Sequence, residues 1–238
     1  MNKKLQNKMT KPSFKLEAVP KDNKTVVYLY GDIVDERPID FWTGEEMQGD
    51  YITPTEVRDL LDASQGDEIE LHINSYGGSV FASVSIFNYL RNLKKPITTV
   101  NDGLCASGAS LIFMAGDKKV MPKNTTLMIH RASSFGWGNC NELRQLANTL
   151  EKLDTSTVFE TYKANFNGTD EELLNLIDSE TWISADEAKN YGLCDEVISF
   201  DNKEETNKEE TKDNKEEIVN TGKKIMMNFA NLKLKGVK

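Results

Sequence analysis

The chain has 238 residues, enough for one well-buried α/β domain with an extension and short for two large domains. Its 38 acidic residues outnumber 29 basic ones, and the formal net charge of -9 argues against a surface that binds nucleic acid. With three cysteines, no CxxC pair and only two histidines, the composition predicts a reduced, cytoplasmic protein without a metal site. No apolar run reaches the length of a membrane span, and none follows the lysine-rich start, so neither a membrane anchor nor a signal peptide is expected.

The N-terminal part predicts a polar segment, a strand and a helix. Residues 1–24 are polar and aperiodic, and residues 25–30 are rich in the β-branched and aromatic side chains of a strand. Residues 35–52 are expected to form a loop. Residues 53–56, Thr-Pro-Thr-Glu, then combine a capping hydroxyl, a proline suited to the first turn and a glutamate whose side chain can reach back to the N-terminus of the helix. We expect the helix that they begin to run to about Ala63.

A strand, a helix and a second strand follow. Apolar and polar side chains alternate over residues 68–74, as in a half-buried strand, and His72 falls on the polar side. After Gly77 and Gly78, apolar residues recur at helical spacing until a proline stops the helix before a strand at residues 97–100. Such a crossover implies that the two strands pair in parallel.

Small residues at 103–110 lead into the apolar segment 111–114, which predicts a buried helix that begins near Ser107. Two short strands are expected after it, at residues 119–121 and 126–130.

The longest helical pattern spans residues 141–163. Its leucines are spaced three and four residues apart, so the helix is expected to bury one stripe against a partner element or subunit. Capping boxes at residues 169–172 and 184–187 begin two further helices, and the folded domain should end near Phe200.

The C-terminal part has two different compositions. Residues 201–220 repeat Asn-Lys-Glu-Glu-Thr and have almost no apolar side chains to offset the entropy of ordering, so they are predicted to be a disordered acidic linker. Residues 221–238 contain lysines and apolar residues without one acid. They are a basic tail that is either mobile, a nascent helix, or a docking peptide for an acidic partner.

Acyl transfer requires a nucleophile, a base and hydrogen-bond donors for the oxyanion, and the sequence offers candidates for all three. Ser107 lies among glycines and alanines at a predicted strand-to-helix junction. His130, at the end of a strand, is the natural base because His72 lies on the polar side of another strand. The amides of residues 74–78 can line an anion-binding turn. Each feature alone also fits an ordinary structural role: close helix packing, a structural histidine or a tight turn.

Together these features resemble the ClpP-type serine peptidase family, peptidase S14. The resemblance extends over roughly residues 25–198 and rests on four segments in the family's order and spacing: residues 73–79, 103–109, 128–130 and 182–193. It implies an α/β fold of the ClpP or crotonase-like type, with repeated βαβ units. It also implies a ring of identical chains, interlocked by a long helix that would lie at residues 141–163.

The family's roles carry over onto matching positions. The resemblance implies that Ser107 is the nucleophile, that His130 is the base, and that the amides of Gly78, or of Gly77, and of Gly108 form the oxyanion hole. For the third triad residue, the family usually has an aspartate two residues before the aromatic that matches Trp182.

This chain has Glu180 at that position. A glutamate can orient an imidazole, so Glu180 is the preferred triad acid and Asp178 is the alternative.

Within the family, residues 115–117, 121–122, 146–154 and 180–182 and the charged extension after Phe200 most resemble phage- and prophage-encoded, ClpP-related head maturation proteases. Such a protease would cleave capsid or scaffold proteins in the bacterial host cytoplasm or in the procapsid. The alternative is a cellular proteolytic subunit whose partner is a Clp ATPase.

Two further alternatives come from other classes: an acyl-CoA enzyme of the crotonase type, and an inactive scaffold protein. The sequence has no P-loop motif and no cluster of metal ligands, so no cofactor is expected. The expected partners are therefore copies of the same chain and protein or peptide substrates, with no nucleic acid and no membrane.

Overall fold

The computed structural model of the chain describes residues 17–21 and 23–200. The predicted acidic linker at 201–220 and the basic tail at 221–238 lie outside the described residues, as do residues 1–16 and 22 of the predicted polar segment. The compact unit of the chain ends at Phe200.

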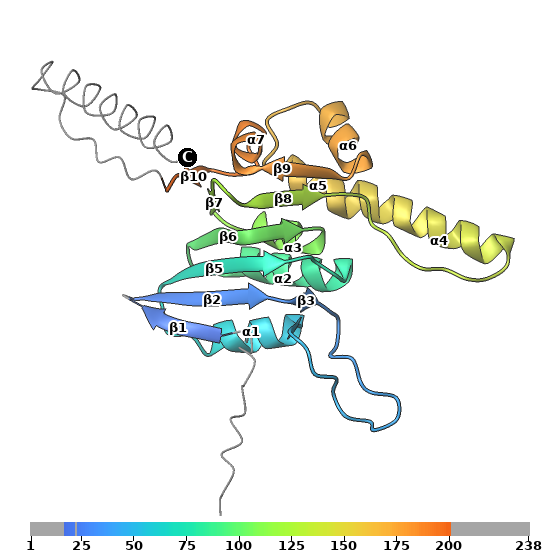
Figure 1. Cartoon of the computed structure of the whole chain (residues 1–238), viewed down its shortest axis with the longest axis horizontal. Helices are drawn as coiled ribbons and strands as arrows, with labels where there is room; N and C mark the ends of the chain where they lie inside the picture. The colour runs from blue at the N-terminus through green and yellow to red at the C-terminus, as the bar shows by residue number, and fades with distance from the viewer. Residues whose placement is uncertain (1–16, 22, 201–238) are drawn as a thin grey trace, which may run out of the picture. The chain divides into compact units, whose positions relative to one another are not determined.

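A mainly parallel, eight-stranded sheet forms the centre of this unit (Figure 1). Neighbouring strands follow the order β1-β2-β5-β6-β7-β10, while β8 pairs with β6 and with β9. A separate two-stranded sheet is made of β3 and β4. The strands are β1 (Glu17–Lys21), β2 (Lys24–Tyr30), β3 (Asp32–Ile33), β4 (Tyr51–Ile52), β5 (Glu68–Ser75), β6 (Ile97–Ala106), β7 (Lys118–Pro122), β8 (Thr126–Ile129), β9 (Thr181–Ser184) and β10 (Glu196–Ile198).

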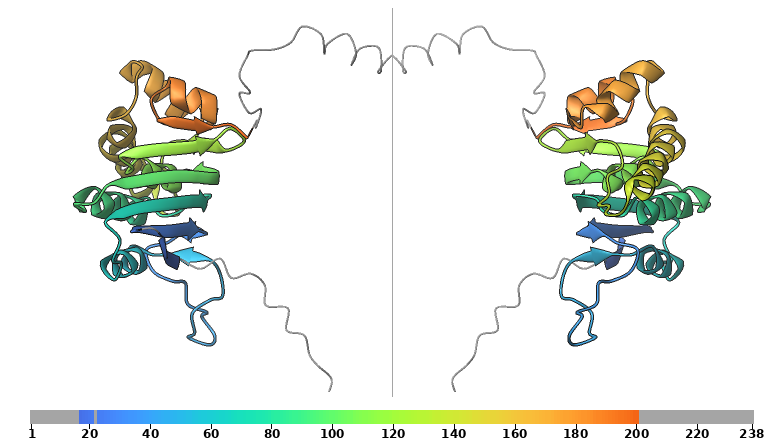
Figure 2. Two further views of the ribbon diagram at one scale, coloured as in Figure 1. Left: turned by 90° about the vertical axis from the view of Figure 1, so that its left-hand side faces the viewer. Right: turned by 90° about the vertical axis from the view of Figure 1, so that its right-hand side faces the viewer.

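The helices gather on one side of the large sheet, as the two side views in Figure 2 show. None of the helices in the described part of the chain is long and apolar enough to cross a membrane. They are α1 (Pro54–Asp62), α2 (Val80–Asn92), α3 (Gly108–Phe113), α4 (Cys140–Leu153), the π-helix η1 (Asp154–Val158), α5 (Phe159–Lys163), α6 (Asp170–Asp178) and α7 (Ala185–Asn190).

Several local predictions are confirmed. The side chain of Thr53 accepts a hydrogen bond from the Glu56 N–H, and the Glu56 carboxylate accepts one from the Thr53 N–H, so the predicted capping box begins α1. In β5 the alternating residues Ile69, Leu71 and Ile73 are buried. The parallel pairing of β5 with β6 across α2 is the predicted crossover.

The structure corrects the prediction at β6. This strand has ten residues and continues to Ala106, whereas the strand was predicted only at residues 97–100. Its first half pairs with β7 and its second half with β8, so the small residues before Ser107 belong to the sheet. The following helix begins at Gly108 and is buried, which confirms the predicted start near Ser107.

Two further elements differ from the prediction. Residues 17–21, which were assigned to the polar segment, form β1 and pair antiparallel with β2. The long helix at residues 141–163 is interrupted by η1, where the Phe159 N–H donates to the carbonyl of Asp154, five residues back. Neither feature is visible as a periodic pattern in its own segment. β1 forms because β2 is available to pair with it, and η1 differs from a regular helix by a single inserted residue.

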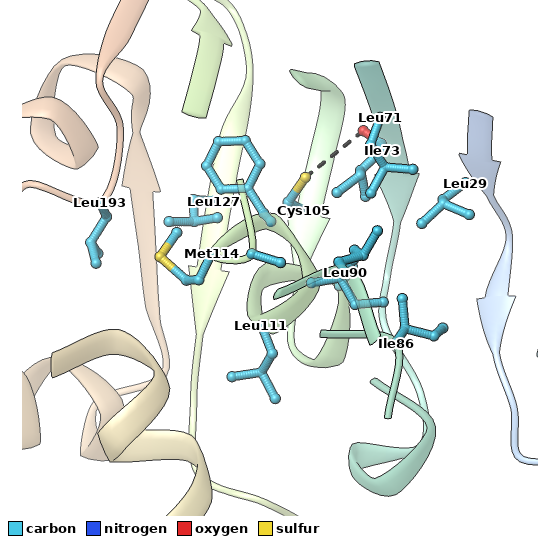
Figure 3. Close-up of a cluster of buried hydrophobic side chains, with 14 of the residues drawn as sticks. Leu29, Leu71, Ile73, Ile86, Leu90, Cys105, Leu111, Met114, Leu127 and Leu193 are labelled. Atoms are coloured by element: carbon cyan, nitrogen blue, oxygen red, sulfur yellow. Dashed lines mark hydrogen bonds between the residues drawn. The ribbon is translucent and has the colours of Figure 1, made fainter. Parts of the chain in front are cut away.

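The hydrophobic core lies between the sheet and α2 and α3 (Figure 3). Leu29 of β2, Leu71 of β5, Leu90 of α2 and Leu127 of β8 have at most 1% of their surface exposed. Burying each side chain of this size stabilises the fold by about 1.5–3 kcal/mol. Burial also raises the pKa of the Cys105 thiol well above its usual value, so this cysteine packs as a small apolar residue.

His72 lies on the sheet face opposite these helices, between two carboxylates. Its Nδ1 is 2.8 Å from both carboxylate oxygens of Asp102, and its Nε2 is 3.1 Å from Glu70 Oε1. The hydroxyl of Tyr30 also donates to Asp102, and the ring of Tyr28 stacks on the imidazole with 5.0 Å between centroids. Burial lowers the pKa of His72, but the hydrogen bonds to Asp102 and Glu70 outweigh burial and raise it above its usual value.

This arrangement predicts a pH-dependent contribution to stability. A raised folded-state pKa means that the charged imidazole stabilises the fold fully below a pH of about 6.5, the usual histidine pKa, and that this contribution is lost as the pH rises through the folded pKa. The melting temperatures of the wild type and of His72→Gln should therefore differ most at low pH and converge at high pH. A difference that stays constant from a pH of about 5.5 to about 9 would contradict this prediction.

Candidate active site

Three neighbouring parallel strands, β5, β6 and β8, deliver the candidate residues to one edge of the sheet. Cys105 of β6 pairs with Ser75 of β5, and Ala106 of β6 pairs with Met128 of β8. Because the carboxyl ends of neighbouring parallel strands meet at the same edge, the residues that follow these three strands lie together. They are Gly77 and Gly78, Ser107 and Gly108, and His130.

Ser107 occupies a strained turn between β6 and α3. Its φ of 52° and ψ of -126° are unusual for a residue other than glycine. The Ser107 N–H donates to the carbonyl of Met128 at 3.0 Å, which ties the turn to β8. A sharp strand-to-helix turn of this kind leaves a serine hydroxyl accessible at its apex.

Ser107 and His130 are in direct contact. His130 Nε2 lies 2.7 Å from Ser107 Oγ, although the residues are 23 positions apart. Both residues are half-buried. The distance is that of a hydrogen bond between a nucleophile and its general base.

The amides of Gly78 and Gly108 lie side by side and are available as donors. A Cβ on Gly108 would be 3.5 Å from the Gly78 nitrogen and 2.2 Å from Ser83 Oγ, so this close approach needs glycine. Among residues 17–21 and 23–200, neither of these two N–H groups has a hydrogen-bond acceptor. The Gly77 N–H, in contrast, donates to Ser75 Oγ at 3.0 Å. Of the two glycines that the sequence analysis named for this part of the oxyanion hole, Gly78 is therefore the one with a free amide.

A groove of about 580 Å³ adjoins the glycine turn. Gly78, whose amide is free, is one of its lining residues. Its lining residues are Asp32, Ile33, Val34, Asp35, Glu36, Tyr76, Gly77, Gly78 and Ser79.

Comparison with known proteins shows the family of the chain. The model of the family described as Clp protease matches residues 22–201. The chain belongs to the Clp protease family. It is therefore a hydrolase of the serine peptidase class, and the resemblance seen in the sequence and the expected α/β fold with a mainly parallel sheet are confirmed.

Its relatives include proteins named ATP-dependent Clp protease proteolytic subunit. The one from Deinococcus radiodurans is 34% identical over 142 residues, which are 58% of this chain and 69% of the relative. One from Bacteroides fragilis is 31% identical over 156 residues, covering 63% of this chain and 74% of the relative. Proteolytic subunit 1 from Streptomyces coelicolor is 31% identical over 175 residues, covering 72% and 78%.

The carboxylates predicted to complete the site of this Clp protease family member do not contact His130. The antiparallel β8–β9 ladder ends at the pair of Ile129 and Thr181, which are the chain neighbours of His130 and Glu180, and the side chain of Glu180 is exposed. Asp178 instead accepts a hydrogen bond from Arg131 Nε at 2.6 Å. Within the described residues, no side chain accepts a hydrogen bond from His130 Nδ1.

Asp154 is a residue near the site that the sequence analysis missed. It is only 7% exposed, and it accepts hydrogen bonds from the Ala132 N–H at 2.7 Å and from Arg131 Nη1 at 3.1 Å. It therefore holds the segment that directly follows His130. The one sequence signal that could have pointed to Asp154 is that this acidic residue directly follows Leu153, a member of the leucine stripe of the predicted helix.

The part of the chain that the structure describes contains no group of three or more His, Cys, Asp or Glu side chains placed to hold a metal ion.

Proposed function

We propose that the chain is a ClpP-type serine endopeptidase with Ser107 as nucleophile and His130 as general base. The observation that carries this proposal is the 2.7 Å contact between Ser107 Oγ and His130 Nε2, next to the free amides of Gly78 and Gly108. The groove along the glycine turn supports an extended substrate such as a peptide, because Gly78 is one of its lining residues.

In the proposed reaction, Ser107 Oγ adds to the carbonyl carbon of a peptide bond while His130 Nε2 takes the hydroxyl proton. The Gly78 and Gly108 amides donate to the resulting oxyanion, where charge develops. The imidazolium then protonates the leaving amine as the C–N bond breaks, and an acyl-enzyme forms on Ser107. Water, deprotonated by His130, hydrolyses this ester and restores the hydroxyl.

The direct test is labelling with a fluorophosphonate probe, together with hydrolysis of a fluorogenic peptide by the same sample. Mass spectrometry of the digested protein should locate the probe on Ser107. A purified, assembled protein that neither takes the label nor cleaves peptides would contradict the proposal and would favour the inactive scaffold.

For the third triad residue, the proposal is Glu180. Its neighbour Thr181 pairs with Ile129, the residue before His130, and the backbone of Glu180 has a φ of 49°, an unusual value for a residue other than glycine. Asp178 is already engaged by Arg131. Rotation of the Glu180 side chain toward Nδ1 would fix the tautomer and stabilise the imidazolium.

Glu180→Gln is therefore expected to lower kcat by about 10²-fold or more, because the imidazolium loses its counter-charge. Asp178→Asn should keep kcat within about threefold, as expected when an exposed ion pair is lost. Steady-state kinetics on a fluorogenic peptide measures both. The reverse order of effects would assign the role to Asp178.

We also propose that the chain self-associates into a ring, and the support for this is the exposed apolar surface of α4. None of its residues is buried, although Leu143, Leu146 and Leu150 form an apolar stripe that continues to Leu153. A stripe of this kind is stable in water when it packs against another protein surface. A native mass that corresponds to a single chain at micromolar concentration would contradict this proposal.

The biological role that we propose is maturation of a phage or prophage head, by cleavage of capsid or scaffold proteins in the bacterial cytoplasm. Its support is the resemblance of residues 115–117, 121–122, 146–154 and 180–182 to that branch of the family. The names of the relatives favour a second candidate, a subunit that acts with a Clp ATPase. Cleavage of a scaffold protein without nucleotide supports the first candidate, whereas degradation of a folded protein only with a Clp ATPase and ATP supports the second.

A further inference from the structure

Two buried hydroxyl groups lie behind the nucleophile turn. Ser110, in α3, has no exposed surface, and Tyr162, in α5, is 1% exposed. The Ser110 hydroxyl donates to the carbonyl of Ser107, and it lies 2.6 Å from the Tyr162 hydroxyl. These contacts connect a residue far along the chain with the backbone of the proposed nucleophile.

The direction of these hydrogen bonds is fixed by the groups themselves. The Ser107 carbonyl can only accept, so the single proton of the Ser110 hydroxyl is used there. The Tyr162 hydroxyl must then donate to Ser110 Oγ. Burial raises the pKa of Tyr162, so its hydroxyl keeps the proton that it donates.

The Ser107 carbonyl belongs to the same planar peptide unit as the Gly108 N–H. A hydrogen bond that fixes the direction of this carbonyl therefore fixes the direction of the amide, which points the opposite way. Donation to a carbonyl also polarises its peptide unit, and such chains of hydrogen bonds strengthen one another. The Ser110 N–H adds a second bond to the same carbonyl, at 3.0 Å.

The π-turn explains how Tyr162 reaches this position. The hydrogen bond from the Phe159 N–H to the Asp154 carbonyl adds one residue to a turn, which rotates all later side chains by about 100° around the helix axis. Figure 1 shows that α5 continues from α4 behind β8. In an uninterrupted helix, Tyr162 would face a different direction.

We propose that Tyr162 and Ser110 are positioning residues that orient and polarise the Gly108 amide for oxyanion binding and hold Ser107 in its strained turn. The proposal rests on the proposed function, because it assumes that Ser107 is the nucleophile. Neither residue touches the substrate, and Tyr162 acts through Ser110.

Tyr162→Phe is the decisive variant, because it keeps the ring and removes only the donor. It should lower kcat, and the second-order rate of fluorophosphonate labelling at Ser107, by about 3- to 10-fold, with KM unchanged. Ser110→Ala should lower both rates at least as much. The double variant should be no slower than Ser110→Ala, because Tyr162 acts only through Ser110.

Thr99→Val is the matched control. Thr99 is fully buried, and its hydroxyl donates at 2.8 Å to the carbonyl of Phe113, at the other end of α3. This variant should lower the melting temperature about as much as Tyr162→Phe but leave the labelling rate unchanged. Equal slowing by Thr99→Val would overturn the proposal, since the effect would then come from a loosened α3.

Labelling of the wild type distinguishes failure of the positioning role from failure of the proposed function. If the wild type is labelled at Ser107 and Tyr162→Phe is labelled equally fast with an unchanged kcat, the positioning role is wrong and the peptidase assignment stands. If the wild type is not labelled at Ser107, both are wrong.

Discussion

Replacing Ser107 with alanine is expected to lower peptidase turnover by about 10⁶-fold, because the acyl-enzyme can no longer form. The residual rate would come from substrate binding and from the oxyanion amides alone. Since Ser107 Oγ is 2.7 Å from His130 Nε2, the substitution also removes the group from which the base takes its proton. Hydrolysis of a fluorogenic peptide, with active sites counted by fluorophosphonate titration of the parent protein, measures the change.

Ser64→Ala is a suitable control for this variant. It removes a hydroxyl that donates at 2.6 Å to the carbonyl of Leu61 near the end of α1, without contact to the candidate site. Its turnover should equal that of the wild type. Wild-type turnover in Ser107→Ala, with the melting temperature retained, would assign peptide hydrolysis to another residue.

Replacing His130 with alanine should have an effect of the same size, about 10⁶-fold on kcat. A serine hydroxyl is a weak nucleophile without a base, so loss of the imidazole removes nearly all of the rate enhancement that nucleophilic attack by Ser107 provides. For the same reason, the double variant Ser107→Ala/His130→Ala should be no slower than either single variant.

His72→Gln is the control for this second experiment, because His72 is the other histidine of the chain and lies in a separate cluster with Asp102 and Glu70. It should alter stability as a function of pH but leave kcat at its wild-type value. Additive losses in the double variant would show that Ser107 and His130 do not act as one unit.

Local features of the fold could be predicted because their information lies in consecutive residues. The capping box of Thr53 and Glu56 and the alternation of Ile69, Leu71 and Ile73 each depend on a few neighbouring positions. The predicted crossover from β5 to β6 follows from the order of such elements. Ser107 and His130 could be singled out because the chemistry of acyl transfer restricts the residue types and because the segments around them resemble a known family.

The contacts that make a site from these residues depend on strand pairing and packing, which no single segment contains. The ladder from β6 to β8 brings Ser107 to His130, and a hydrogen bond from the Gly77 N–H to Ser75 leaves the Gly78 amide as the free one. One extra residue in a helical turn directs Tyr162 toward Ser110. Most helices and several strands, together with the reactive residue types, could therefore be predicted from short stretches of sequence. Which groups meet depends on the folded chain, because register and close packing are set by residues that are distant in the sequence.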